Sequence, residues 1–183
     1  VKDLEQQGFE VYCPQLTTNV HEDIVMLNNL INDLKDEDLH IVGCSLGGYY
    51  ALVLLSRIFS ENAIHFHLIN PSLVPWKSIE RFLNKNMKNY KTGEEYQLTI
   101  SFLNALKQYL AGIEGISSRQ FFNVTFYFGK KDKILDHSRT KDWIQTCKLP
   151  CKVIETNQSH RFEDISTVIH EINELEIANN IEW

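Results

Sequence analysis

The chain alternates between short apolar runs of strand length and longer segments whose apolar residues recur at helical spacing. The strand-like runs cover residues 9–13, 39–44, 63–69, 123–129 and 151–155. Helical patterns occupy residues 1–7, 19–34, 46–59 and 138–147, and a last amphipathic helix runs through Val168, Ile169 and Ile172. This alternation is typical of a parallel sheet covered by helices, so it predicts an α/β fold.

Residues that commonly end or cap helices and strands lie at the limits of the first predicted elements. Gly8 follows the first helical segment, where glycine commonly stops a helix, and Pro14 closes the first strand-like run. Asn19 or Thr18 can cap the helix that begins near residue 20. The sequence therefore predicts a helix, a strand and a second helix before the run at 39–44.

Residues 71–120 interrupt the alternation with two helical patterns. The first carries Ile79, Phe82, Leu83 and Met87 on one side, and the second carries Phe102, Leu103, Leu106, Tyr109, Leu110 and Ile113. Because the insertion follows the carboxyl end of a strand, we expect a helical lid above the sheet edge. The whole of residues 1–183 is expected to form a single domain.

The join between the run at 39–44 and the next helix reads Gly43-Cys44-Ser45-Leu46-Gly47. It matches G-x-S-x-G, in which a sharp turn from strand to helix exposes a nucleophilic serine at the carboxyl edge of a sheet. Side chains at Gly43 or Gly47 are expected to collide with the neighbouring backbone in such a strained turn. The bare pattern also fits a glycine-rich turn that only packs a helix against a sheet, with Ser45 a bystander.

A serine hydroxyl needs a histidine to accept its proton and a carboxylate to orient that histidine. In a parallel sheet, both must come from loops at the edge that carries Ser45. Asp132 follows the strand at 123–129 and His160 follows the strand at 151–155, which gives the chain order Ser, Asp, His. Asp136 is the alternative acid, and His137 is disfavoured as the base because it lies in the same loop as the acid.

The helix that begins near Leu46 directs its free amide groups and the positive end of its dipole toward the group that Ser45 attacks. The backbone N–H of Leu46 is therefore predicted to donate a hydrogen bond in an oxyanion hole.

Composition narrows the range of partners. Lys and Arg number 18 against 24 Asp and Glu, for a net charge of -6, which argues against non-specific nucleic-acid binding. No apolar run has the length of a membrane span, and the N-terminus shows no secretory signal, so we expect a cytoplasmic protein without a membrane partner.

Neither the cysteines nor the strand histidines favour a metal site. None of Cys13, Cys44, Cys147 and Cys151 forms a C-x-x-C pair, and the first two lie in strand-like runs, where cysteine behaves as a small apolar residue. His65 and His67 share one face of a predicted strand but lack an evident third ligand, and a polar strand face explains them equally well. We therefore expect no metal and no cofactor.

Several stretches resemble the YqiA-like family of small bacterial α/β-hydrolase esterases, and they occur in family order from about residue 4 to about residue 173. They are Pro14-Gln15-Leu16, Gly43 to Ala51, Leu68 to Pro75, Thr92 to Thr99, Asp132 to Asp136 and Asn157 to Phe162. The resemblance implies an α/β-hydrolase fold and hydrolysis of carboxylic esters, with Ser45, Asp132 and His160 at the matching triad positions.

At its N-terminus the sequence departs from the family pattern. The family opens with an apolar strand and a His-Gly-Phe loop that supplies a second oxyanion donor, and this sequence begins downstream of them with valine. In the family's sheet the absent strand lies between the runs at 9–13 and 39–44. Without it, we expect the chain either to be inactive or to close the gap by direct pairing of these two runs.

The leading hypothesis is a serine hydrolase that cleaves small-molecule esters, or thioesters, through an acyl-Ser45 intermediate. A non-catalytic binding module on the same fold is the main alternative. A phosphate or nucleotide site at the helix start is disfavoured, because neither G-x-G-x-x-G nor a Walker lysine is present.

Overall fold

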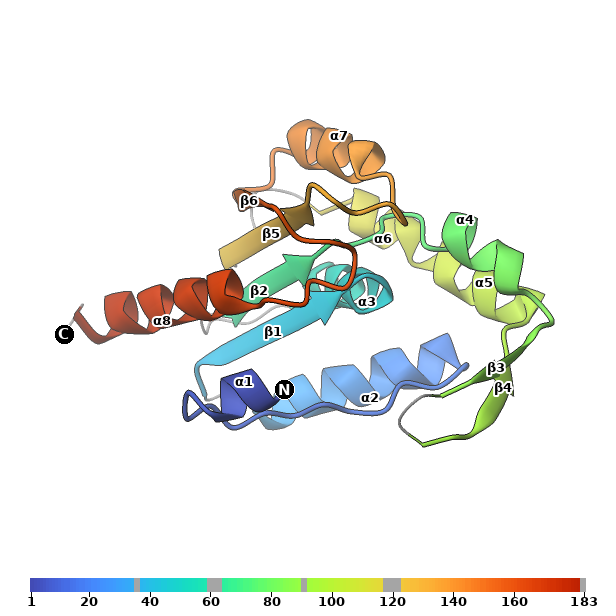
Figure 1. Ribbon diagram of the computed structural model, residues 1–183, viewed down its shortest axis with the longest axis horizontal. Helices are drawn as coiled ribbons and strands as arrows, with labels where there is room; N and C mark the ends of the chain where they lie inside the picture. The colour runs from blue at the N-terminus through green and yellow to red at the C-terminus, as the bar shows by residue number, and fades with distance from the viewer. Residues whose placement is uncertain (35–36, 59–63, 90–91, 117–122, 182–183) are drawn as a thin grey trace.

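The computed structural model describes residues 1–183 except 35–36, 59–63, 90–91, 117–122 and 182–183. Its main sheet has four strands in the order β1-β2-β5-β6. Their bounds are β1 Leu39–Cys44, β2 Ile64–Ile69, β5 Asn123–Gly129 and β6 Lys152–Thr156. All three neighbouring pairs are parallel, which confirms the mostly parallel α/β architecture (Figure 1). Their carboxyl ends, and the loops that follow them, therefore meet at one edge of the sheet.

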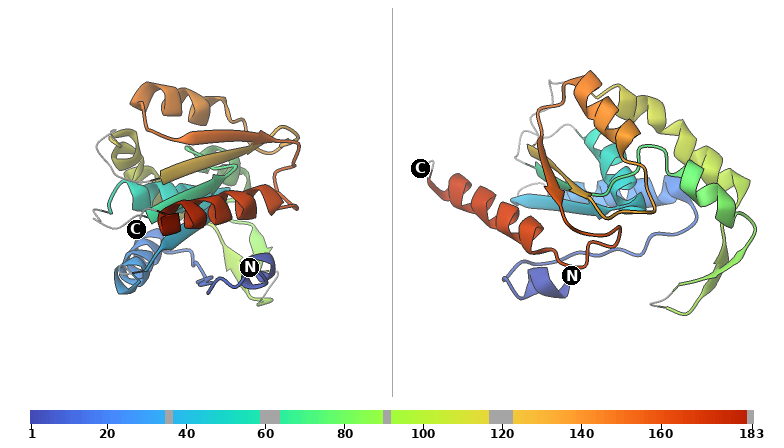
Figure 2. Two further views of the ribbon diagram at one scale, coloured as in Figure 1. Left: turned by 90° about the vertical axis from the view of Figure 1, so that its left-hand side faces the viewer. Right: turned by 45° about the horizontal axis from the view of Figure 1, so that its top comes forward.

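Helices cover both faces of this sheet. Figure 2 shows α8 and the N-terminus on one side and α2, α3 and α6 on the other. The helices outside the insertion are α1 Lys2–Glu5, α2 Val20–Asp33, α3 Leu46–Leu55, α7 Ser138–Cys147 and α8 Ser166–Ile181. The side chain of Asn19 caps α2 by accepting a hydrogen bond from the Glu22 backbone N–H. α3 ends four residues before its predicted end at Phe59, which lies outside the described residues, as do Ala63 and residues 35–36.

The two faces of β2 differ in chemistry because successive side chains of a strand point to opposite faces. Ile64, Phe66 and Leu68 belong to the large apolar core on the side of α2, α3 and α7. The other face carries His65 and His67, which are fully buried, so this polar strand face lies inside the protein. At the end of this face, Ile69 packs with Tyr127 and residues of α8 in a second, smaller cluster.

Helix α3 is buried from Gly48 to Leu55, as its apolar sequence predicts. Tyr49 is fully buried, and its hydroxyl donates a hydrogen bond to the backbone carbonyl of Leu106 in the insertion. The helix that follows Ser45 is thus held on one side by the sheet and on another by the insertion.

The strand predicted at residues 9–13 is wrong. The segment has no ladder partner in the described part of the chain and runs outside the sheet. Phe9 packs against the α8 cluster and meets the ring of His40 edge-on at a centroid distance of 6.4 Å, whereas Tyr12 is half exposed. The expected direct pairing of residues 9–13 with β1 therefore does not occur, because a strand needs a neighbouring backbone and not only an apolar pattern.

The insertion is less helical than predicted. It contains α4 Trp76–Ile79, the short 3₁₀ helix η1 Glu80–Phe82, the strands β3 Asn86–Lys88 and β4 Glu95–Gln97, α5 Ile100–Gln108 and α6 Leu110–Glu114. β3 and β4 form an antiparallel hairpin that extends away from the sheet (Figure 1), so Met87 lies in a strand rather than in the predicted helix. The helix stops because Asn84 adopts a left-handed backbone with φ 57° and donates its N–H to Leu98 instead. The second pattern does form helices, and a lid function for the insertion stays a prediction.

Within the described residues, none of the helices combines the length and the apolar character that crossing a membrane requires. The four cysteines are free. Cys44 ends the strand β1 as expected, whereas Cys13 lies outside any strand, and both residues are exposed rather than packed as small apolar residues.

Candidate active site

The turn between β1 and α3 holds Ser45 in a strained backbone conformation, with φ 54° and ψ -114°. Gly43 permits the turn, because a Cβ at this position would lie 2.5 Å from the Gly47 carbonyl oxygen. The expected collision at Gly47 is wrong, since a Cβ there meets nothing within 4 Å. The second close approach involves Gly48, whose added Cβ would lie 2.8 Å from Pro71 at the end of β2.

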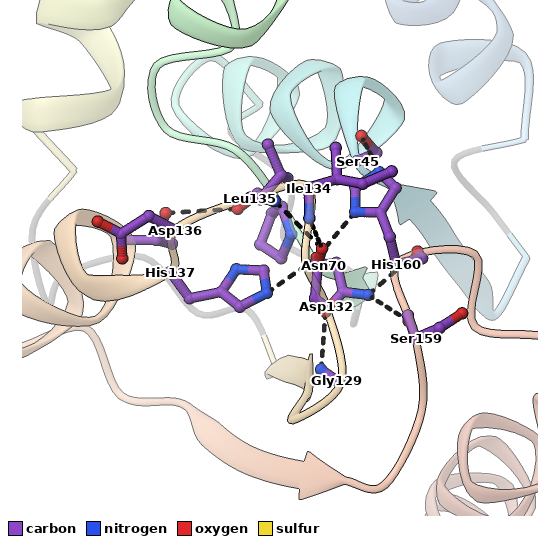
Figure 3. A network of polar contacts seen from close by, with 12 residues as sticks. Ser45, Asn70, Gly129, Asp132, Ile134, Leu135, Asp136, His137, Ser159 and His160 are labelled. Atoms are coloured by element: carbon purple, nitrogen blue, oxygen red, sulfur yellow. Dashed lines mark hydrogen bonds and ion pairs between the residues drawn. The ribbon is translucent and has the colours of Figure 1, made fainter.

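Three side chains that are far apart in the sequence converge at the carboxyl edge of the sheet (Figure 3). The Nδ1 atom of His160 lies 2.8 Å from Asp132 Oδ2, and its Nε2 atom lies 3.0 Å from Ser45 Oγ. A carboxylate can only accept, so the ring proton belongs on Nδ1, and Nε2 is left to accept a hydrogen bond from the Ser45 hydroxyl. The imidazole is therefore placed to receive a proton from Ser45 while Asp132 fixes its tautomer.

Asp132 is held as a carboxylate inside the protein. Its side chain is fully buried, and its Oδ1 atom accepts hydrogen bonds from the backbone N–H groups of Ile134 at 2.7 Å and Leu135 at 3.1 Å. Burial acts to raise the pKa of Asp132, but the hydrogen bonds from His160 and from these two N–H groups outweigh it and lower the pKa below its ordinary value. The group next to His160 is therefore negatively charged at neutral pH.

The alternative acid, Asp136, points elsewhere. It is exposed, and its Oδ1 atom accepts a hydrogen bond from the backbone N–H of Ser138 at the start of α7, at 2.9 Å. The structure thus brings Asp132, and not Asp136, to His160.

His137 lies next to the acid in a way that the sequence analysis missed. Its Nε2 atom is 3.0 Å from Asp132 Oδ2, its side chain is only 12% exposed, and its ring packs on Phe128 at 5.0 Å. Burial lowers the pKa of His137, which keeps the ring neutral at pH 7. The available signal in the sequence was that Asp136 and His137 follow the strand in the same loop as the acid.

Asn70, at the end of β2, is the second residue that the sequence analysis missed. It is fully buried, and its side chain is hydrogen-bonded to Gly129, Ser159 and His160 (Figure 3). A polar residue directly after a buried strand of the same sheet was the available signal, because it places the side chain at the edge that carries Ser45.

Leu46 is the first residue of α3, directly after Ser45. The first N–H groups of a helix have no partner within the helix, so the Leu46 N–H is available to a group bound at Ser45. This placement is compatible with the predicted oxyanion donor.

The strand histidines form a separate cluster away from this edge. His40 joins His65 and His67, with ring centroids 4.7 Å and 5.3 Å away, and the Nδ1 atom of His40 lies 3.0 Å from His67 Nε2. The outer nitrogen of His40 contacts Glu176 of α8 at 2.8 Å. Among the described residues, no group of three His, Cys, Asp or Glu side chains has an arrangement that could hold a metal ion.

Comparison with known proteins adds a family and a fold. The model of a family described as "Uncharacterised protein family (UPF0227)" matches residues 3–177. Among solved structures, Est1E from Butyrivibrio proteoclasticus is similar, with a TM-score of 0.62 at 11% identity over 90% of this chain and 72% of that one.

Two further structures show the same likeness. Alpha/beta hydrolase domain-containing protein 10 from mouse has a TM-score of 0.62 at 18% identity, over 87% of this chain and 70% of that chain. A monoacylglycerol lipase from Paleococcus ferrophilus has a TM-score of 0.58 at 14% identity, over 84% and 72%. At these identities the likeness establishes the fold, which is that of the α/β-hydrolases.

Proposed function

Given that the chain belongs to the uncharacterised protein family UPF0227 and has the α/β-hydrolase fold, we propose that it is a serine hydrolase of small carboxylic esters. One observation carries the proposal: His160 bridges the Ser45 hydroxyl at 3.0 Å and the Asp132 carboxylate at 2.8 Å. Both distances lie within the range over which a general base can act. The esterases and lipases among the structural neighbours point the same way.

In the proposed reaction, Ser45 Oγ attacks the ester carbonyl carbon as His160 Nε2 takes the hydroxyl proton. The charge that develops on the carbonyl oxygen is stabilised by the N–H of Leu46. Collapse of the tetrahedral intermediate breaks the bond to the alcohol, which leaves with the proton from His160. Water then attacks the acyl-Ser45 ester by the same route and releases the acid, with Asp132 stabilising the charged imidazole in both halves.

The proposal is tested by comparing the esterase activity of variants at two serines with that of the parent protein. The protein is assayed with p-nitrophenyl esters of two to eight acyl carbons and with a matching thioester, alongside Ser45→Ala and Ser56→Ala. Ser56 lies at the other end of α3, where its hydroxyl donates to the Val53 carbonyl, so its variant controls for a serine substitution in the same helix.

We expect hydrolysis by the protein and by Ser56→Ala, and a loss of about 10⁴-fold or more in Ser45→Ala. Equal rates in the protein and in Ser45→Ala contradict the proposal. A folded protein that hydrolyses neither class of substrate supports the alternative, a non-catalytic binding module on the same fold.

A further inference from the structure

Asn70 ends β2 in a backbone conformation that few residues adopt. Its φ is 42°, and its own N–H donates to the Tyr127 carbonyl of β5 at 2.8 Å. Asparagine visits this left-handed region more readily than most residues do. The turn aims the side chain into the interior, where none of the residue is exposed to solvent.

Both ends of the Asn70 amide are hydrogen-bonded. Oδ1 accepts from the Gly129 N–H at 2.8 Å, and Nδ2 donates to the carbonyls of Ser159 at 3.2 Å and His160 at 3.1 Å. The backbone partners fix the orientation of the amide, because an N–H can only donate and a carbonyl can only accept. Both amide hydrogens therefore have an acceptor in the loop that carries His160.

These contacts join the three loops that carry the site. Gly129 ends the strand that leads to Asp132, and Ser159 precedes His160. On the other side of Asn70, the carbonyl of Ile69 accepts a hydrogen bond from the Ser45 N–H at 2.9 Å. Asn70 thus lies where the chain segments of the serine, the acid and the base meet (Figure 3).

The His160 loop also lies close against β5 at this point. A Cβ on Gly129 would come within 2.5 Å of the Gln158 carbonyl oxygen, and that carbonyl accepts a hydrogen bond from the Lys131 N–H at 3.0 Å. The backbone contacts fix the start of the loop, and the Asn70 amide fixes the carbonyl of His160 itself. The thiol of Cys44, at the end of β1, makes a weaker contact with the same carbonyl, with its Sγ atom 4.0 Å away.

We propose that Asn70 is a positioning residue, which sets the distance of the His160 ring from Ser45 and Asp132 by holding the His160 backbone. The inference rests on the proposed function for its effect on rate, while the effect on ring position stands apart from it. A reacting group displaced by about 1 Å can cost roughly 100-fold in rate.

The test is Asn70→Asp, which keeps the size and shape of the side chain but places an oxygen against two carbonyl oxygens. With p-nitrophenyl acetate, we expect kcat to fall about 100-fold and KM to stay within about threefold, since the serine and the binding surface are unchanged. Asn84→Asp is the matched control, because Asn84 is exposed and shares the left-handed backbone, with φ 57°. It is expected to leave kcat unchanged.

A double-mutant cycle separates positioning from general support of the fold. If Asn70 acts through His160, Asn70→Asp has little further effect on the residual rate of His160→Ala. An equal loss of rate in the presence and absence of His160 overturns the proposal. So does a folded Asn70→Asp protein with the kcat of the parent.

Proton NMR provides a readout that does not depend on turnover. The His160 Nδ1 proton, bonded to Asp132, is expected to give a downfield resonance in the parent and in Asn84→Asp, and to be lost or shifted in Asn70→Asp. If Asn70→Asp fails to fold, Asn70→Gly, which accepts the left-handed backbone, takes its place with the same expected outcomes. An inactive parent whose resonance moves with Asn70 contradicts the proposed function alone, whereas an unmoved resonance contradicts the role of Asn70.

Discussion

Two regions of the molecule contain clustered histidines in opposite environments. At the carboxyl edge, His160 is 16% exposed and lies between a hydroxyl and a buried carboxylate. On the sheet face beneath α8, His65 and His67 are fully buried, and their nearest ring neighbour is another histidine, His40.

The difference teaches that the neighbours of a histidine, and not its presence, decide what it can do. His160 lies between the Asp132 carboxylate at 2.8 Å and the Ser45 hydroxyl at 3.0 Å. Burial, with smaller contributions from the nearby His40 and His65, lowers the pKa of His67 to about 3. The pKa of His65 is lowered as well, mainly by burial. The buried pair is thus neutral at pH 7, whereas the proposed function requires His160 to accept and return a proton.

The largest expected effect comes from removing the anion beside His160. Asp132→Asn keeps the shape of the acid but presents an amide to the ring, which favours the wrong tautomer, so we expect kcat to fall by about 10⁴-fold. Ester hydrolysis measures this, with Asp136→Asn as the matched control in the same loop. A fall of less than tenfold in Asp132→Asn, or an equal fall in both variants, contradicts the assignment of the acid.

The buried histidines are expected to make the fold sensitive to acid. In the unfolded chain His67 binds a proton below its ordinary pKa of 6.5, whereas in the folded protein it does so only near pH 3. Protonation therefore favours the unfolded chain, and the free energy of unfolding decreases as the pH falls below about 6.5. From pH 7 to pH 5 the loss is about 2 kcal/mol from this residue alone. Urea unfolding at pH 7, 6 and 5 measures it, and a stability that stays constant or rises toward pH 5 contradicts the neutral pair.

His67→Phe tests the hydrogen bonds within the cluster. The ring nitrogens of His67 contact His40 Nδ1 at 3.0 Å and the Tyr127 hydroxyl at 2.9 Å, and both partners lose a neighbour in the variant. We expect a loss of about 1–3 kcal/mol in unfolding free energy at pH 7, together with a weaker dependence on pH. Unchanged stability at pH 7 indicates that these contacts contribute nothing.

His65→Phe is expected to have the smallest effect, with the opposite sign. In the part of the chain that the structure describes, neither ring nitrogen of His65 has a hydrogen-bond partner, although the ring stacks on His40. Phenylalanine keeps the ring and removes two buried polar atoms, so we expect a gain of up to about 1 kcal/mol. Urea unfolding beside His67→Phe makes the comparison, and a loss larger than 1 kcal/mol shows that His65 has a partner that matters.

The parallel sheet and the meeting of Ser45, Asp132 and His160 followed from sequence, because both depend on local patterns. Each of the three residues comes directly after a strand or shortly beyond it, and parallel strands bring such positions to one edge. Their chemical roles remain predictions. The histidine cluster was missed because His40 meets His65 and His67 only through the register of two strands, and a sequence pattern does not contain that register.

The wrong predictions have related causes. Residues 9–13 have the apolar pattern of a strand, but a strand also needs a backbone beside it. The hairpin of β3 and β4 was missed because the helical spacing of apolar residues continues to Met87, whereas the left-handed backbone of Asn84 ends the helix. In both cases contacts with other parts of the chain decided the structure.

Covalent labelling tests the central claim most directly. The protein and its variants His160→Ala and His21→Ala are incubated with a fluorophosphonate at pH 7, and peptide mass spectrometry locates the adduct and follows its rate. We predict one adduct, on Ser45, formed at least about 10³-fold more slowly in His160→Ala and at the parent rate in His21→Ala, whose histidine is exposed on α2. Absence of an adduct on Ser45 in the folded protein, or labelling of His160→Ala at the parent rate, contradicts the account.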